Sequence, residues 1–249
     1  MNRYFIKLAY KGNGYSGWQR QPNALTIQEI LEDSLSMILQ QTVKLTGAGR
    51  TDAGVHASEY FAHFDLDQSI TPKRLDNLVF KLNGFLNGNI VAYRIFQVES
   101  NFHARYSAIS RTYKYFITTV KNPFRQDLTY FLYGPFDIYL MNEASKVIME
   151  YSDYTSFSKT ETDTKTNICK VEYAHWDLIG NELMFTIKAD RFLRNMVRAI
   201  VGTLIMVGRG KLTIEELRWI IESRNRSNAG VSAPACGLHL VRIEYPWDL

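Results

Sequence analysis

The segment Gly47–His56, which reads GAGRTDAGVH, holds the side chains of this chain best placed for chemistry. Its three glycines let the backbone turn tightly and approach a ligand closely. A free aspartate has a pKa of ~3.9, so Asp52 is expected to be a carboxylate at neutral pH. Arg50 lies close before it, and an Arg50–Asp52 pair could equally do no more than tighten a hairpin loop. The segment therefore indicates either a carboxylate in a ligand-binding loop or a structural ion pair.

A second candidate group is a row of arginines in the segment Arg191–Gly202 (RFLRNMVRAIVG). Arg191, Arg194 and Arg198 are spaced i, i+3 and i+7, which predicts one shared face of a helix whose other faces are apolar. A half-buried arginine requires a carboxylate or a phosphate, because an unpaired buried charge costs several kcal/mol. Solvation alone would satisfy Arg191 better than Arg198.

Positive charge is concentrated in two stretches, residues 94–125 and 188–211. Each contains six basic side chains and one acidic one, whereas the whole chain carries a net charge of only +4. Clustered cations on an otherwise acidic chain favour binding of a polyanion, because each neutralised phosphate releases counterions. Solvated protein faces are the alternative explanation. Interleaved aromatic residues in the first stretch favour nucleic acid, because they can stack on unpaired bases; they are Tyr106, Tyr113, Tyr115 and Phe116.

The segment Gly12–Gly17 matches G-x-G-x-x-G, but we do not interpret it as a dinucleotide site. The residues WQRQP follow in place of a helix start, which this motif would need. We therefore predict a turn in a loop that presents the donors Gln19, Arg20 and Gln21. None of the five histidines has metal-ligand spacing. No metal and no nucleotide cofactor is expected.

The elements that must position these residues repeat the order βαββαβ, the split pattern of ferredoxin-like domains. A capping box at Thr26 and Glu29 starts one helix, and Thr71-Pro72 starts the next. We therefore expect an α+β fold with a first domain at residues 1–104 and a second at residues 105–249. Strands are expected at 3–10, 43–48, 59–65, 90–98, 108–119, 170–179, 182–189 and 237–245, with a turn at Gly180-Asn181, helices at 139–151 and 192–207, and a short helix capped by Thr213 and Glu216.

Length and composition fit an ordinary globular protein. The chain has 249 residues, of which 46% are hydrophobic and 22% are charged, which excludes disordered and collagen-like classes. Its longest apolar run, from Ala199 to Gly208, is shorter than the ~20 residues that cross a bilayer. The amino terminus lacks the pattern of a signal peptide. We therefore expect a cytoplasmic protein without a membrane segment.

Five motifs together carry a resemblance to a known family. In chain order they are YSGWQRQ, GAGRTDAGVHA, FHARYSAISRTYKY, MVRAIVG and CGLHLVRIEYP. With these motifs in this order, the chain resembles the tRNA pseudouridine synthase A family over nearly its whole length. The resemblance implies two ferredoxin-like or RRM-like halves, with antiparallel sheets that flank a basic central cleft. It also implies a homodimer in which one tRNA bridges both subunits.

The resemblance further implies a reaction that needs no external atoms and no cofactor. Such enzymes break the N-glycosidic bond of a uridine on the 3′ side of the anticodon arm, turn the base and rejoin it to the sugar through carbon. Asp52 matches the aspartate of the family motif and is therefore expected to be the nucleophile. Attack on the sugar, attack on the uracil ring, and action as a base toward a glycal intermediate all stay open.

Other site residues follow from the same match. Tyr113 is expected to stack on the target uracil and to accept the proton released from its ring carbon, and Arg198 is expected to hold Asp52 ionised. Arg50 is expected to help displace the nucleotide, which must leave the base stack to reach a buried carboxylate. Leu238 is expected to pack against the flipped base. The expected contacts to the RNA backbone are His103, Arg105, Arg191, Arg194, Gln19, Arg20 and Gln21.

Three places depart from the family pattern. Glu59-Tyr60 stands where many members have Gly-Gln, Leu86–Asn89 lacks the common L-P-x-D, and Arg194-Asn195 is a variable position. These departures bear on loop contacts and substrate breadth, and they leave the catalytic residues unchanged. Two other functions stay open. One is a non-catalytic RNA-binding module, although the RNP pattern is absent, and the other is a nucleoside hydrolase, which usually needs a second catalytic acid.

Overall fold

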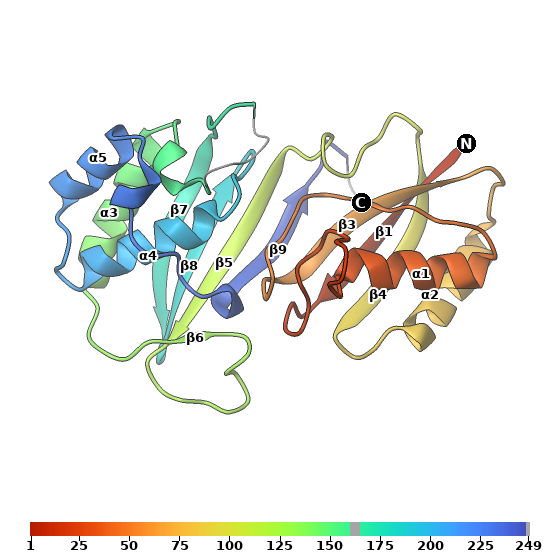
Figure 1. Cartoon of the computed structure of the whole chain (residues 1–249), viewed down its shortest axis with the longest axis horizontal. Coiled ribbons are helices and arrows are strands. Elements are labelled where there is room, and N and C mark those ends of the chain that lie inside the picture. The colour runs from red at the N-terminus through yellow and green to blue at the C-terminus, as the bar shows by residue number, and fades with distance from the viewer. Residues whose placement is uncertain (160–164, 248–249) are drawn as a thin grey trace. The chain divides into compact units, whose positions relative to one another are not determined.

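The computed structural model describes residues 1–159 and 165–247 of the chain. In these ranges the backbone forms nine β-strands and five α-helices, so the α+β class expected from the sequence is confirmed (Figure 1). The elements belong to two compact units, one of Met1–Ile109 with the segment from Leu240 onward and the other of Ser110–His239. The expected strand at 237–245 is present, but most of it belongs to the first unit and not to the second half of the chain. No helix in the described ranges is long and apolar enough to span a membrane.

The first unit has the βαββαβ order that the sequence predicts. Its strands are antiparallel where β1 pairs with β3 and β4 and where β2 pairs with β3, and β9 lies next to β3. Both helices lie on one side of this sheet (Figure 1). The elements are β1 (Asn2–Tyr10), α1 (Ile27–Leu39), β2 (Thr46–Gly47), β3 (His56–Leu66), α2 (Pro72–Phe85), β4 (Ile90–Val98) and β9 (Leu238–Glu244).

The core of the first unit is rich in aromatic side chains on both faces of the sheet. Successive side chains along β1 and β3 point to opposite faces of the sheet. On one face Tyr4 stacks on Phe64 with ring centroids 5.6 Å apart. On the other, Tyr245 makes edge-to-face contacts with Phe5 at 5.7 Å and with Phe61 at 5.4 Å. Each such ring contributes about 2 kcal/mol by burial, which makes this sheet a stable support for its loops.

Helix α1 ties two loops to the sheet through a buried carboxylate. Its first turn is capped by the Thr26 hydroxyl, which accepts a hydrogen bond from the Glu29 amide at 3.3 Å, while the Glu29 carboxylate of the predicted capping box pairs with Arg20 at 3.3 Å. One turn further, the buried Glu32 carboxylate accepts a hydrogen bond from the Leu45 amide at 2.9 Å and pairs with Arg20 at 3.3 Å. The segments before and after α1 are therefore held to the same helix.

The second unit follows the predicted order from its first strand to its last helix, with the short strand β6 in addition, but most of the expected final strand lies in the first unit. Strands β5, β8 and β7 lie side by side in antiparallel pairs, and α3, α4 and α5 lie on one side of them (Figure 1). The turn at Gly180 is confirmed with a φ of +61°, and so is the capping box of Thr213 and Glu216. The elements are β5 (Ser110–Thr118), β6 (Tyr130–Phe131), α3 (Ile138–Glu150), β7 (Val171–Ile179), β8 (Glu182–Ala189), α4 (Met196–Gly208) and α5 (Ile214–Glu222).

Helix α4 begins later than the sequence predicts. Asn195 adopts the left-handed conformation, with a φ of +66°, and the helix starts only at Met196. A left-handed residue cannot continue a right-handed helix, so Arg191 and Arg194 precede α4 and only Arg198 lies on it. The prediction that the three arginines share one helix face is therefore wrong.

Two histidines shape the segment Phe102–Ser107 of the first unit. The buried His63 ring accepts a hydrogen bond at Nδ1 from the Ala104 amide at 3.1 Å. Burial, reinforced by the charges of Arg3 and His103 and opposed by Asp65, lowers the pKa of His63 to about 4. The ring is therefore neutral at pH 7, as an Nδ1 that accepts a hydrogen bond must be.

We expect the protein to lose stability as the pH falls from about 6.5 to 4. Over this range the unfolded chain takes up a proton on His63 that the folded chain resists, so the free energy of unfolding falls by about 3 kcal/mol at most. Urea unfolding at several pH values measures this. His63→Asn, whose amide oxygen can still accept from Ala104, should flatten the decline, whereas His175→Asn on β7 should not. An equal decline in wild type and His63→Asn would contradict the assignment.

Candidate active site

Asp52 lies in the connection between β2 and β3, residues 48–55, here called the Asp52 loop. Its side chain is half-buried, whereas that of Arg50 is exposed. The loop closes in a turn in which the Val55 amide donates to the Asp52 carbonyl at 3.2 Å, with Gly54 at a φ of +79°. The carboxylate therefore stands on a closed backbone turn, while Arg50 extends toward solvent.

The Asp52 loop rests on three buried aromatic rings. Trp18 packs against Tyr60 with centroids 4.2 Å apart, and Tyr10 meets Tyr60 edge-on at 5.5 Å. The Tyr60 hydroxyl donates to the Gly49 carbonyl, and the Tyr10 hydroxyl hydrogen-bonds the Thr51 hydroxyl at 2.9 Å. Gly49 and Thr51, the two neighbours of Arg50, are therefore held by buried tyrosines that cannot move without disturbing the core.

The glycines of G-x-G-x-x-G bring a second segment, residues 11–26, against the Asp52 loop; we call it the Trp18 loop. A Cβ on Gly12 would lie 2.1 Å from the Val55 carbonyl oxygen, and one on Gly17 would lie 2.4 Å from the Thr51 oxygen. The Trp18 amide donates to that same Thr51 oxygen at 3.2 Å. The motif therefore serves close packing of two backbones, which gives a physical reason for the turn predicted from the sequence.

The Trp18 loop also places the three predicted polar contacts. Gln19, Arg20 and Gln21 are all exposed. The Arg20 guanidinium pairs with three carboxylates of α1, the nearest being Asp33 at 3.0 Å. Gln21 donates to the Ser16 carbonyl at 3.0 Å. Much of the charge of Arg20 is thus neutralised within the first unit. Of the three side chains, we therefore expect that of Gln19 to be the least involved in contacts within the protein.

His103 and Arg105 lie together in the first unit and have different environments. The His103 Nδ1 accepts hydrogen bonds from the amides of Arg105 at 3.1 Å and Tyr106 at 3.2 Å. Burial, with the nearby charges of Arg3 and Arg105, lowers the pKa of His103. A neutral His103 cannot attract a phosphate by charge, so its clearest task is to shape the turn that presents Arg105.

Tyr113 and Arg198 belong to the second unit. Tyr113 is half-buried in β5 opposite Ile187 of β8, and its ring meets Phe192 edge-on at 5.1 Å. Arg198 is half-buried on α4, and its Nε donates to the Ala233 carbonyl at 2.7 Å. Both side chains are thus held in place by neighbours from other segments of their own unit.

The remaining predicted residues of the second unit differ in exposure. Arg194 is exposed, and Arg191 is half-buried with Nη1 donating to the Thr166 carbonyl at 3.2 Å. Leu238 is buried at the start of β9. It follows Gly237, where a Cβ would lie 2.7 Å from the Tyr115 ring. The close approach of the Gly237 backbone to the Tyr115 ring therefore determines the position of Leu238.

Two departures from the family pattern have structural roles that the sequence did not reveal. The Glu59 carboxylate accepts from the Ile243 amide at 3.1 Å and pairs with Lys7 at 2.7 Å, so it joins β3 to β9. The Asn87 side chain hydrogen-bonds the Tyr15 hydroxyl of the Trp18 loop at 2.8 and 3.0 Å. These contacts could not be predicted from the residues next to Glu59 or Asn87, because the partners are distant along the chain.

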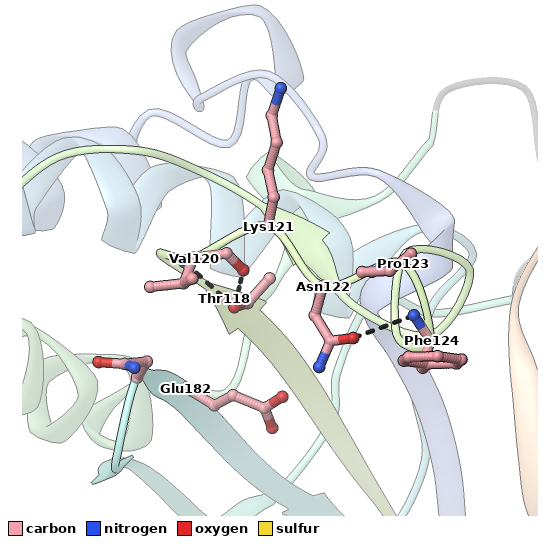
Figure 2. Close-up of a pocket in the computed structure, with 8 residues that line it drawn as sticks. Thr118, Val120, Lys121, Asn122, Pro123, Phe124 and Glu182 are labelled. Atoms are coloured by element: carbon pink, nitrogen blue, oxygen red, sulfur yellow. Dashed lines mark hydrogen bonds between the residues drawn. The ribbon is translucent and has the colours of Figure 1, made fainter.

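A hollow of about 360 Å³ lies elsewhere in the second unit, at the ends of β5 and β8 (Figure 2). None of the predicted site residues lines it. Across the described ranges, no three His, Cys, Asp or Glu side chains group as metal ligands would. The hollow is lined by Thr118, Val120, Lys121, Asn122, Pro123, Phe124, Asn181 and Glu182.

Gly12→Ala should destabilise the protein because its Cβ would collide with the Val55 carbonyl of the Asp52 loop. Overpacking of this kind costs about 1–3 kcal/mol, to be measured by urea unfolding. Gly84→Ala is the matched control, since nothing lies within 4 Å of its Cβ position and alanine favours the surrounding helix. Equal stability of Gly12→Ala and wild type would mean that the two loops are not packed as described.

Comparison with known proteins identifies the family of this chain. A family model described as tRNA pseudouridine synthase matches residues 8–107 and 151–246. A protein named tRNA pseudouridine synthase A from Bacteroides thetaiotaomicron is 52% identical over 252 residues, covering 100% of this chain and 93% of that protein. The protein of the same name from Exiguobacterium sibiricum is 36% identical over 246 residues, covering 99% and 98%. The chain therefore belongs to the tRNA pseudouridine synthase family.

Proposed function

We propose that this protein isomerises uridine to pseudouridine on the 3′ side of the anticodon arm of tRNA, in the cytoplasm and as a homodimer. Membership of the family supports the activity on tRNA. The observation that carries the proposal is the Asp52 loop, whose backbone is fixed by contacts with the Trp18 loop and whose Asp52 is half-buried, inside the matched region. A fixed carboxylate is what glycosidic chemistry requires near developing positive charge.

The reaction is a rearrangement within one nucleotide. The bond from the sugar C1′ to uracil N1 breaks, and a bond from C1′ to uracil C5 forms. The proton on C5 is lost, and N1 gains a proton, so no atom is added and no electron acceptor is needed. The chemistry asks for a nucleophile or base, a proton acceptor and a surface that holds the turned base.

We assign the nucleophile or base to Asp52 and the proton acceptor to Tyr113. The edge contact with Phe192 leaves the Tyr113 ring in a defined orientation, which suits stacking on uracil. Arg198 is assigned to keep Asp52 ionised, since a half-buried guanidinium whose Nε is already fixed on Ala233 is a pre-oriented partner for an anion. Leu238 is assigned to the apolar side of the flipped base.

Arg50 and the cationic stretches are assigned to the RNA. Arg50 is exposed on a rigid loop next to Asp52, the position from which a side chain could replace a displaced nucleotide. Arg194 and Arg105 are exposed and are assigned to phosphates, with Arg191, Gln19 and Gln21 as further contacts. In this proposal two ferredoxin-like halves flank a basic cleft, which is supported by the two stretches of six cations each in the sequence.

Tritium release from tRNA tests the activity and the role of Asp52 together. An unmodified tRNA labelled at uracil C5 should lose tritium to water with the wild type and not with Asp52→Asn, because the amide is neither a nucleophile nor a base. Equal release by both proteins would remove Asp52 from the mechanism. Absence of release from either would favour an RNA-binding module without catalysis.

The two arginines of the second unit should separate turnover from binding. Arg198→Ala should lower kcat more than tRNA affinity, because its proposed target is the catalytic carboxylate. Arg194→Ala should weaken tRNA affinity and reduce the steepness of its salt dependence by the equivalent of about one phosphate contact. Binding titrations at several salt concentrations, combined with single-turnover rates, measure both. The reverse pattern would mean that the two roles are exchanged.

A further inference from the structure

Three aromatic rings of the first unit form a column that rises from the core to the surface. His63, 5% exposed, meets His103 edge-on with centroids 4.7 Å apart. His103 in turn packs on Tyr106 at 4.4 Å with the ring planes 35° apart. The Tyr106 ring is 75% exposed. The column therefore ends in an aromatic side chain that is supported from beneath and open to solvent.

The backbone that carries Tyr106 is fixed by groups of the core. Arg3 donates to the Phe102 carbonyl at 2.9 Å, and the Tyr245 hydroxyl donates to the Ala104 carbonyl at 2.6 Å. The His63 ring accepts a hydrogen bond from the Ala104 amide, and the His103 ring accepts hydrogen bonds from the amides of Arg105 and Tyr106. An exposed tyrosine on so constrained a turn loses little further freedom when a ligand stacks on it, which favours binding.

Charge next to the ring indicates which ligand it suits. The Arg105 guanidinium lies over the Tyr106 ring, 5.5 Å from its centroid. A guanidinium at a largely exposed aromatic ring offers contacts to both the phosphate and the base of one unstacked nucleotide. Tyr115, another aromatic of the same basic stretch, is fully buried, so the fold selects Tyr106 for exposure.

We propose that Tyr106 is a base-stacking residue for tRNA, with Arg105 beside it for the adjoining phosphate. The proposal rests on the proposed function, because tRNA is the ligand. The nucleotide concerned is one whose base is unstacked when the RNA is bound. A protein partner would instead require a wider apolar surface than one ring with a cation over it.

Affinity for unmodified tRNA, measured by fluorescence anisotropy at several salt concentrations, tests the proposal. Tyr106→Ala should weaken binding about 5- to 100-fold with an unchanged salt slope, because stacking releases no counterions. Tyr106→Phe should bind as the wild type does, because it keeps the ring. Tyr139→Ala, which removes a tyrosine of α3 that is also 75% exposed, is the matched control and should bind as the wild type does.

Wild-type affinity of Tyr106→Ala, or an equal loss in Tyr139→Ala, would overturn the proposal. So would a thermal unfolding temperature for Tyr106→Ala far below that of Tyr106→Phe, which would make the ring structural. A change in self-association with unchanged tRNA affinity would assign the ring to a protein contact instead. Tritium release separates the two proposals. If the wild type releases tritium and Tyr106→Ala has the KM of the wild type, only the stacking role fails. If the wild type releases no tritium, the proposed function itself fails.

Discussion

The structure depends above all on the close backbone contact between the Trp18 loop and the Asp52 loop. Side chains at Gly12 or Gly17 would overlap the carbonyls of Val55 or Thr51, so the contact exists only because both positions lack a Cβ. The same contact seats Trp18 on Tyr60, and Tyr60 then holds the Gly49 carbonyl. The position of the backbone that carries Asp52 thus follows from steric exclusion between two loops and from ring packing beneath them.

Some of the charged side chains in this protein are paired within the fold, whereas others are exposed to solvent. Arg3 is engaged by Asp65 through two hydrogen bonds of 2.7 and 2.8 Å, and Arg20 is engaged by carboxylates of α1. Arg50, Arg105 and Arg194 are exposed. His63 and His103 also serve the fold, because burial lowers the pKa of each ring and the neutral rings accept hydrogen bonds from backbone amides. A count of cations in the sequence therefore overstates the charge that can meet a phosphate.

Local signals in the sequence were sufficient for most elements and failed where backbone conformation was unusual. The caps at Thr26 and Thr213 and the turn at Gly180 are encoded by neighbouring residues, so α1, α5 and the β7–β8 hairpin were predicted. Asn195 was not, because its left-handed conformation interrupts a pattern that otherwise continues the helical spacing of the arginines. The two-residue strand β6 was missed because so short a strand has no periodicity to detect.

By itself the sequence determined the α+β class, most of the order of the elements and the family, and it singled out the residues that we propose to be catalytic, because alternation, capping and motif identity are properties of neighbouring residues. Only the tertiary structure decided why the glycines of the Trp18 loop are needed, which arginines are already engaged, and that Tyr106 is open while Tyr115 is buried. Those properties depend on contacts between residues far apart in the chain. Burial and steric exclusion exist only once such contacts have formed.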